Sequence, residues 1–232
     1  ARFPRGLGPI GERCAQVGAK LLLWFEPERV HHGTWLAERH PEWVLYRTGE
    51  NSAQHNGLLN LALPEVQDWL IDHIDGLVKE YGVGIYRQDF NYDPMPNWIA
   101  NEPPDREGAL ENLHEQGYLR CCDELLRRNP GLLLDSCASG GRRNELETMR
   151  RAVPLHYTDV GYGEHPIKQK QHRFMFEWIP YFRAHNMNWC DPEGVYGRGS
   201  FPADRYSYHC AFAPALTDMT DRERTRYRAE KI

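Results

Sequence analysis

The sequence lacks the features that mark several large classes of protein. Its 232 residues contain no apolar run near the roughly 18 residues that a membrane-spanning helix needs. The net charge of −5 leaves no basic excess, which argues against a nucleic-acid binder. Two short arginine clusters, at 142–143 and 150–151, lie close to glutamates, as on a solvated helix face. We therefore expect neither a membrane nor a nucleic acid among its partners.

Cysteine is too scarce for a disulfide scaffold. The six cysteines form no C-x-x-C pair, so we expect free thiols and favour a reducing, cytoplasmic location. Residues 1–4 show neither the basic region nor the apolar stretch of a signal peptide. The adjacent His31 and His32 would point in different directions, and neither H-x-H nor H-E-x-x-H occurs. We expect no metal and no other cofactor.

What the sequence does contain suits one large globular domain. Hydrophobic residues make up 41% of the chain, enough to bury a sizeable core. Aromatic residues reach 12%, which fits a heavily packed core or rings that stack on a ligand. No internal repeat or linker is visible. We treat residues 1–232 as one domain, because α/β barrels commonly reach this size.

Short apolar runs alternate with longer amphipathic ones. The pattern predicts strands at 20–25, 83–86, 132–137 and 155–158, and weaker strand candidates near 186–190 and 210–216. It predicts helices at 64–81, 107–128, 144–151 and 165–183. In the helix at 107–128 we expect the inward side chains to be Leu110, Leu113, Leu119, Cys122, Leu125 and Leu126.

Strands that alternate with helices indicate an α/β fold with a parallel sheet. Each strand is apolar and changes abruptly to polar residues at its carboxyl end, where a (β/α)8 TIM barrel keeps its chemistry. An open doubly wound sheet would normally carry a glycine-rich phosphate turn after an early strand, and none is present. We therefore predict a TIM barrel.

Four strand ends carry groups that could bind or react. They are Trp-Phe-Glu-Pro-Glu at 24–28, Arg-Gln-Asp-Phe-Asn at 87–91, Asp-Ser-Cys-Ala-Ser-Gly-Gly-Arg-Arg at 135–143 and Tyr-Thr-Asp at 157–159. Taken singly, such residues are more often turn formers, helix caps or core side chains. Four such ends in one alternating chain favour a site around one barrel mouth.

Two carboxylates in these segments suggest a reaction. Asp89 and Asp159 would face each other across the barrel mouth, and glycoside hydrolysis needs such a pair, about 5–5.5 Å apart when configuration is retained. Arg87, two residues before Asp89, would point to the same side of the strand and keep Asp89 ionised. A drier setting would keep Asp159 protonated.

The four segments, in this order, resemble the catalytic barrel of melibiase-type α-galactosidases, glycoside hydrolase family 36, whose clan also holds family 27. The resemblance extends over nearly the whole chain, and the cysteine–glycine segment is its specific part. It implies that Asp89 is the nucleophile and Asp159 the general acid/base of a retaining α-glycosidase. Substrate contacts are then expected from Trp24, Arg87, Asn91, Cys137, Gly140, Gly141 and Arg143.

The chain also departs from the family pattern. Arg87 replaces the family's lysine, Gln88 replaces its usual tryptophan, and residues 160–164 lack its polar run. A guanidinium is a planar fork and an ammonium a point charge, so the first change bears on which sugar is bound. We expect an α-galactosidase. The alternatives are an α-N-acetylgalactosaminidase and a carbohydrate-binding remnant without catalysis.

The last departure is length. In the family two barrel strands precede the segment that matches 24–28, and residues 3–7 resemble the approach to the third strand. We therefore expect about strands 3 to 8 of an incomplete barrel, in a piece of a longer protein. Six strands cannot close an eight-stranded barrel. Any homo-oligomer would form through regions outside this chain.

Overall fold

The computed structural model describes residues 3–155, the single residues Asp159, Gln171, Phe174 and Glu177, and the backbone of 185–187 and 213–215. The chain divides into two compact units. Unit 1 comprises residues 1–139 and 145–153, and unit 2 comprises 140–144 and 154–232. The predicted strand at 155–158 lies outside the described residues beyond Leu155.

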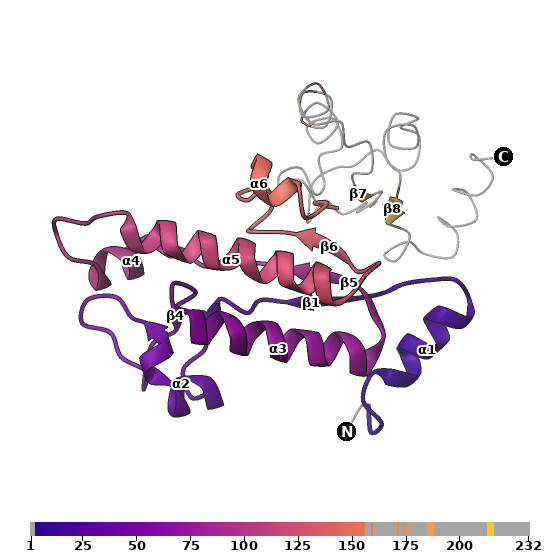
Figure 1. Ribbon diagram of the computed structural model, residues 1–232, viewed down its shortest axis with the longest axis horizontal. Coiled ribbons are helices and arrows are strands. Elements are labelled where there is room, and N and C mark those ends of the chain that lie inside the picture. Colours follow the sequence, from indigo (N-terminus) through magenta and orange to yellow (C-terminus); the bar gives the residue numbers. More distant parts are fainter. Residues whose placement is uncertain are drawn as a thin grey trace, which may run out of the picture. The chain divides into compact units, whose positions relative to one another are not determined.

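Most described elements belong to unit 1 (Figure 1). Its helices are α1 (Gly8–Gln16), α2 (Trp35–Arg39), the 3-10 helix η1 (Pro41–Trp43), α3 (Pro64–Tyr81), α4 (Met95–Asn101), α5 (Ala109–Arg128) and α6 (Leu146–Met149). Its strands are β1 (Leu21–Phe25), β2 (Arg29–Val30), β3 (Val44–Leu45), β4 (Gly57–Leu59), β5 (Val83–Gln88) and β6 (Leu133–Ser136).

Unit 2 contains two short strands, β7 (His185–Met187) and β8 (Ala213–Ala215), which pair in parallel. They overlap the weaker strand candidates of the sequence. The three described residues in the range 171–177 are helical, inside the helix predicted at 165–183. The rest of that predicted helix lies outside the described residues.

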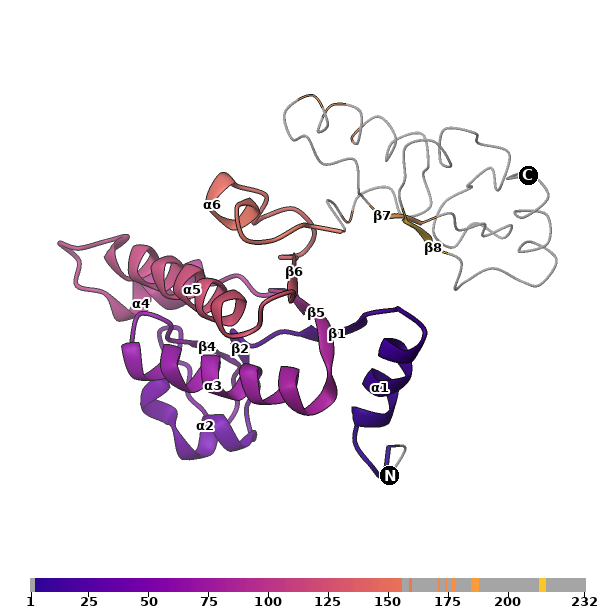
Figure 2. The same ribbon diagram turned by 45° about the vertical axis from the view of Figure 1, so that its right-hand side comes forward.

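A parallel sheet of order β1-β5-β6 organises unit 1. Its strands match those predicted at 20–25, 83–86 and 132–137. α3 precedes β5 and α5 precedes β6 along the chain, which is the strand–helix–strand order that parallel pairing requires. Tyr86 and Leu134 face α3 and α5 from the sheet, and Figure 2 shows both helices on one side of it. The architecture is the α/β class that the sequence predicts.

α3 is the helix that the sequence predicts best. Pro64 and Glu65 begin it, as suits a first turn, and Gly82 ends it in the left-handed conformation with φ +65°. Its buried apolar stripe consists of Val66, Leu70, Ile71, Ile74 and Val78. This stripe faces α5 and the sheet, so the helix is stabilised mainly by burial of one face.

α5 begins at Ala109, two residues later than predicted. The prediction that Leu113 points into the core is wrong. Leu113 is 49% exposed, whereas His114, Tyr118 and Cys121 are buried. Successive helical residues are about 100° apart, so the face centred on these three leaves Leu113 outside. α5 packs tightly against the chain at Gly117, where an added Cβ would lie 2.0 Å from the Leu61 carbonyl oxygen.

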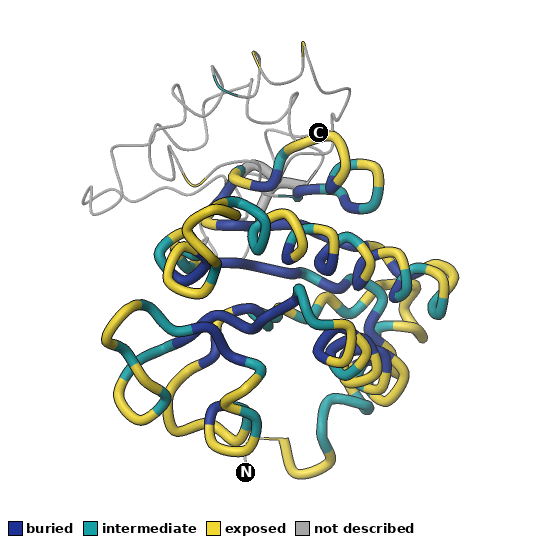
Figure 3. The backbone as a smooth tube through the Cα atoms, turned by 60° about the vertical axis from the view of Figure 1, so that its left-hand side comes forward, coloured by how far each residue is buried: buried dark blue, intermediate teal, exposed yellow. Residues whose placement is uncertain are grey.

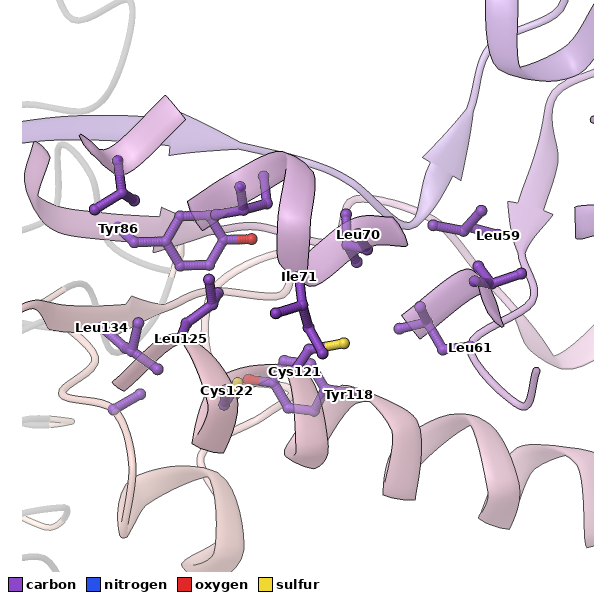
Figure 4. Close-up of a cluster of buried hydrophobic side chains, with 14 of the residues drawn as sticks. Leu59, Leu61, Leu70, Ile71, Tyr86, Tyr118, Cys121, Cys122, Leu125 and Leu134 are labelled. Atoms are coloured by element: carbon purple, nitrogen blue, oxygen red, sulfur yellow. The ribbon is translucent and has the colours of Figure 1, made fainter. Parts of the chain in front are cut away.

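The main core lies between the sheet and these two helices. Figure 4 shows Tyr86 and Leu134 of the sheet together with Ile71 of α3 and Cys121 and Leu125 of α5. In Figure 3 buried and exposed residues alternate along the helices, which is typical of amphipathic helices with one covered face. Burial also raises the pKa of the Tyr86 hydroxyl well above its ordinary value. One face of the sheet is therefore covered by the packed side chains of α3 and α5.

The sequence did not predict the antiparallel sheet of order β2-β4-β3, which lies between β1 and α3 along the chain. Its strands are two or three residues long, too short to show an alternating pattern. Gly57 is required in β4, because a Cβ there would lie 2.2 Å from Val44 Cγ1. The helix predicted at 144–151 is also shorter, and only 146–149 are helical.

Candidate active site

The face of the β1-β5-β6 sheet that α3 and α5 do not cover, called the open face below, carries the site residues of unit 1. Strand register sets them in rows, because alternate residues point to one face. Leu22, Ile85 and Leu133 form an apolar row, and Trp24, Arg87 and Asp135 form the next one towards the carboxyl ends. Asp89 follows β5 and Cys137 follows β6. Polar groups thus gather at the carboxyl ends of the strands, as the sequence predicts.

Asp89 is nearly buried and held through both of its carboxylate oxygens. The Trp24 indole Nε1 donates to Oδ2 at 3.1 Å, and the Phe90 backbone N–H donates to Oδ1 at 2.8 Å. The backbone N–H of Asp89 donates to the Phe25 carbonyl at 2.8 Å, which continues the pairing of β1 with β5. Its position is therefore fixed by backbone and side chain together.

The same contacts explain the charge of Asp89. Burial acts to raise its pKa, but hydrogen bonds from the Asn91, Cys137 and Trp24 side chains and the Phe90 amide outweigh burial, so the pKa lies below its ordinary value. Asp89 is consequently ionised at neutral pH. An ionised, oriented carboxylate at a strand end can act as a nucleophile or stabilise a developing positive charge.

Arg87 has a direct partner, Asp135, that the sequence did not predict. Its guanidinium Nη1 donates to Asp135 Oδ2 at 2.5 Å, across the register pair of β5 and β6. Burial acts to lower the pKa of Arg87, but Asp135 outweighs this and raises it. The charge of Asp89 also raises the pKa of Arg87, so the two charges favour each other as the sequence predicts. The hydrogen bonds are the first causes of the lowered Asp89 pKa, and the direct partner of Arg87 is Asp135.

Trp24 and Asn91 flank Asp89. Trp24 is 49% exposed, so its ring can still meet a ligand while its indole N–H holds Asp89. The Asn91 backbone N–H donates to Glu26 Oε1 at 2.6 Å, and its Oδ1 accepts from the Ser139 hydroxyl at 3.1 Å. Ser139 has a positive φ of +46°, which marks a tight turn after β6.

Cys137 is buried directly after β6. Its backbone N–H donates to the Gln88 carbonyl at 2.8 Å, which extends the β5–β6 pairing by one residue. Its side chain contributes to lowering the pKa of Asp89. The structure thus brings together Trp24, Arg87, Asp89, Asn91 and Cys137 in unit 1.

The remaining predicted site residues belong to unit 2. Gly140 has a φ of +83°, a conformation that favours glycine, and the Asn144 N–H donates to the Gly141 carbonyl at 3.1 Å. Arg143 is buried and Asp159 is exposed. The roles of these four residues, and the pairing of Asp159 with Asp89, remain predictions.

Sequence reasoning missed a buried polar network below Asp89. Glu28 has no exposed surface, and its two carboxylate oxygens contact Gln88 Nε2 at 2.8 Å and His114 Nε2 at 2.9 Å. Gln88 Oε1 accepts from the Tyr86 hydroxyl at 2.9 Å. The only signal in the sequence is His114, a polar residue four positions before the buried Tyr118 of α5.

Two further findings concern metals and membranes. No group of three or more His, Cys, Asp and Glu side chains within the described residues is arranged to hold a metal ion. The rings of His31 and His32 stack 4.3 Å apart, and His31 Nδ1 lies 2.7 Å from the His32 carbonyl oxygen. Among the described helices, none has the length and apolarity needed to cross a membrane.

Comparison with known proteins adds the family. The melibiase family matches residues 1–161. The probable α-galactosidase C of Aspergillus flavus is 37% identical over 154 residues, which cover 61% of this chain and 19% of that protein. The α-galactosidase C of Emericella nidulans is 32% identical over 166 residues, covering 67% and 20%. The chain spans about a fifth of the length of these curated relatives.

Solved structures show the fold. A variant of the family 36 α-galactosidase AgaA from Geobacillus stearothermophilus, in complex with stachyose, matches with a TM-score of 0.79 at 22% identity, over 98% of this chain and 32% of that one. The α-galactosidase from Lactobacillus brevis matches with a TM-score of 0.77 over 99% and 32%. The parallel sheet of unit 1 is consistent with part of a TIM barrel. The chain belongs to the melibiase family of glycoside hydrolase family 36 type.

Proposed function

We propose that this chain supplies the catalytic residues of a retaining α-galactosidase, with Asp89 as nucleophile and Asp159 as general acid/base. The observation that supports this most is Asp89 itself. It is ionised and oriented by the Trp24 indole and the Phe90 amide at the carboxyl end of β5. Residues 1–232 then form one catalytic domain that supplies about strands 3 to 8 of a (β/α)8 barrel.

The reaction proceeds by double displacement. Asp89 attacks the anomeric carbon of an α-galactosyl group, and the bond to the leaving oxygen breaks as Asp159 donates a proton to that oxygen. A β-linked galactosyl-enzyme results. Asp159 then takes a proton from water, the water oxygen replaces Asp89 at the anomeric carbon, and galactose leaves in its α configuration.

The substrate follows from the relatives and from the open face of the sheet. The relatives are named α-galactosidases, and two AgaA variants were solved with stachyose and raffinose. A terminal α-galactosyl residue of an oligosaccharide is therefore the proposed substrate. The exposed Trp24 ring provides a wall for the sugar, and Arg87, Asn91, Cys137, Gly140, Gly141 and Arg143 are the proposed polar contacts. The relatives' names favour galactose over N-acetylgalactosamine.

The test uses alanine variants of both acids in the whole protein, with azide added. Asp89→Ala should lower kcat on a nitrophenyl α-galactoside at least about 10³-fold. Azide should then yield β-galactosyl azide, because it attacks from the side that Asp89 occupied. Asp159→Ala should instead yield α-galactosyl azide, formed when azide opens the galactosyl-enzyme.

Asp93→Ala is the matched control, because Asp93 is an exposed aspartate four residues beyond Asp89. It should keep normal activity. Full activity of Asp89→Ala would contradict the proposal. Sugar binding without turnover in the unaltered protein would instead support the carbohydrate-binding remnant.

A further inference from the structure

The buried network below Asp89 links the three elements that meet at this strand end. Glu28 follows β1, Gln88 ends β5 and His114 lies in the second turn of α5. Glu28 also accepts the Leu59 N–H at 2.8 Å through its backbone carbonyl, which joins the antiparallel sheet to the same point. The rings of Trp98 and His114 pack edge to face, with their centroids 5.3 Å apart. The network is thus enclosed on several sides by packed elements.

Gln88 is the member next to the reacting group. Side chains alternate along a strand, so Gln88 points towards the helices while Asp89 points to the open face. Gln88 therefore makes no contact with a sugar bound on that face. Its main chain is also fixed, because its carbonyl accepts the Cys137 N–H and the next residue donates to the Phe25 carbonyl. Gln88 and Asp89 share one peptide, so the hydrogen bonds of the Gln88 side chain and those of the main chain hold the same strand end.

Stability alone does not require a buried polar contact such as that of Glu28 with His114. Removing Glu28 and His114 from water costs free energy, and apolar side chains of similar size often stabilise a core equally well. Such a contact does constrain how the elements that carry its residues are placed. Both carboxylate oxygens of Glu28 have a partner at hydrogen-bonding distance, and these contacts join the segment between β1 and β2 to β5 and α5.

We propose that Gln88 and Glu28 are positioning residues for Asp89. The hydrogen-bonded chain Tyr86–Gln88–Glu28–His114 holds the carboxyl end of β5 so that the Asp89 carboxylate meets the Trp24 indole and the anomeric carbon. The inference rests on the proposed role of Asp89. It extends that role to residues that touch no substrate.

The test is Gln88→Leu in the whole protein, assayed on a nitrophenyl α-galactoside. The substitution removes both side-chain hydrogen bonds of Gln88 and roughly keeps its volume. The expected result is a fall in kcat of about tenfold or more with KM changed less than about twofold, because small displacements of a reacting group lower the rate steeply while leaving binding intact. Rates are referred to the folded fraction, measured by circular dichroism.

Gln67→Leu is the matched control. Gln67 is likewise a buried glutamine held by two side-chain hydrogen bonds, one to the Leu61 carbonyl at 2.7 Å and one from Arg120 at 2.8 Å. It lies on α3 and not at a strand end. It should lose stability as Gln88→Leu does but keep kcat within about twofold. An equal loss of kcat in both variants, or none in Gln88→Leu, would overturn the inference.

Two further variants separate the possible failures. If Gln88→Leu does not fold, Tyr86→Phe decides, since it removes only the hydroxyl that donates to Gln88. It should lower kcat about threefold with KM unchanged, and an unaltered kcat would overturn the inference. If Asp89→Ala is inactive while Gln88→Leu and Tyr86→Phe are fully active, the inference fails and the proposed function stands. An active Asp89→Ala refutes the proposed function itself.

Discussion

The two faces of the β1-β5-β6 sheet have opposite characters. The face covered by α3 and α5 is apolar along most of its length, with Tyr86 and Leu134 in the main core. The open face carries Trp24, Arg87 and Asp89, with polar groups gathered at the carboxyl ends. On the covered side Glu28 contacts the His114 ring, and on the open side Arg87 forms an ion pair with Asp135.

The difference shows how one short sheet can be both rigid and reactive. The covered face supplies burial, and the Tyr86–Gln88–Glu28–His114 network lies behind Asp89. The open face supplies charge, and its groups are held by hydrogen bonds from neighbouring strands rather than by packing. Substitutions on the two faces should therefore have different consequences, and three of them sharpen the comparison.

The largest effect on stability is expected on the open face, from Asp135→Asn. This change leaves the Arg87 guanidinium without its carboxylate, and breaking a buried ion pair typically costs 3–5 kcal/mol. Because solvent reaches 18% of the Arg87 side chain, we expect about 3 kcal/mol, at the low end of that range. Urea unfolding measures it. A loss below about 1 kcal/mol, as for an exposed pair, would show that the open face is better solvated than its geometry indicates.

A smaller loss is expected behind the covered face, from Gly117→Ala. The new Cβ would lie 2.0 Å from the Leu61 carbonyl oxygen, so α5 must move away, which costs about 1–3 kcal/mol. Gly76→Ala in α3 is the control, because nothing lies within 4 Å of its added Cβ. It should instead gain about 0.5–1 kcal/mol from helix propensity. Thermal unfolding of both variants checks the prediction, and equal shifts would contradict the close approach of α5.

The smallest effect concerns the pH dependence of activity, in Trp24→Phe. Losing the indole donor raises the pKa of Asp89 towards its ordinary value, since that hydrogen bond helps to lower it. The acidic limb of kcat/KM should therefore move to higher pH. Trp35→Phe, an exposed tryptophan of α2, should leave the limb in place. An unmoved limb in Trp24→Phe would mean that another group sets it.

The same substitution, Trp24→Phe, should also change how the free energy of unfolding depends on pH. A carboxylate whose pKa is lowered by folding stabilises the folded state above its unfolded pKa of about 3.9, and this stabilisation is lost as the pH falls through the folded value. Trp24→Phe reduces the contribution that Asp89 makes to the stability of the folded state, because its pKa is then lowered less. The difference in unfolding free energy between the unaltered protein and Trp24→Phe should then become smaller as the pH falls.

The sequence predicts the parts of the fold that depend on local pattern. β1, α3, β5, α5 and β6 could be predicted because each has a long apolar run or stripe with a clear end, such as Pro64 and Gly82 around α3. The strands of the antiparallel sheet could not, because two or three residues carry no period. Asp89 could be predicted as well, because it directly follows the apolar run of β5.

Long-range polar partners escape such reasoning. His114 is buried because Glu28, 86 residues away in sequence, meets its ring. Leu113 was expected in the core instead, since a lone leucine is a better core candidate than a histidine on pattern alone. The Arg87–Asp135 pair was missed for the same reason, because register across parallel strands is invisible in one sequence.

The most direct measurement is to trap the galactosyl-enzyme. A fluorinated α-galactosyl fluoride that forms the intermediate quickly and releases it slowly would be mixed with the whole protein, and the labelled peptide would be sequenced by mass spectrometry. Attachment of one sugar to the Asp89 carboxylate is the predicted result. Attachment to any other residue, or turnover of the reagent with no label, would contradict the account.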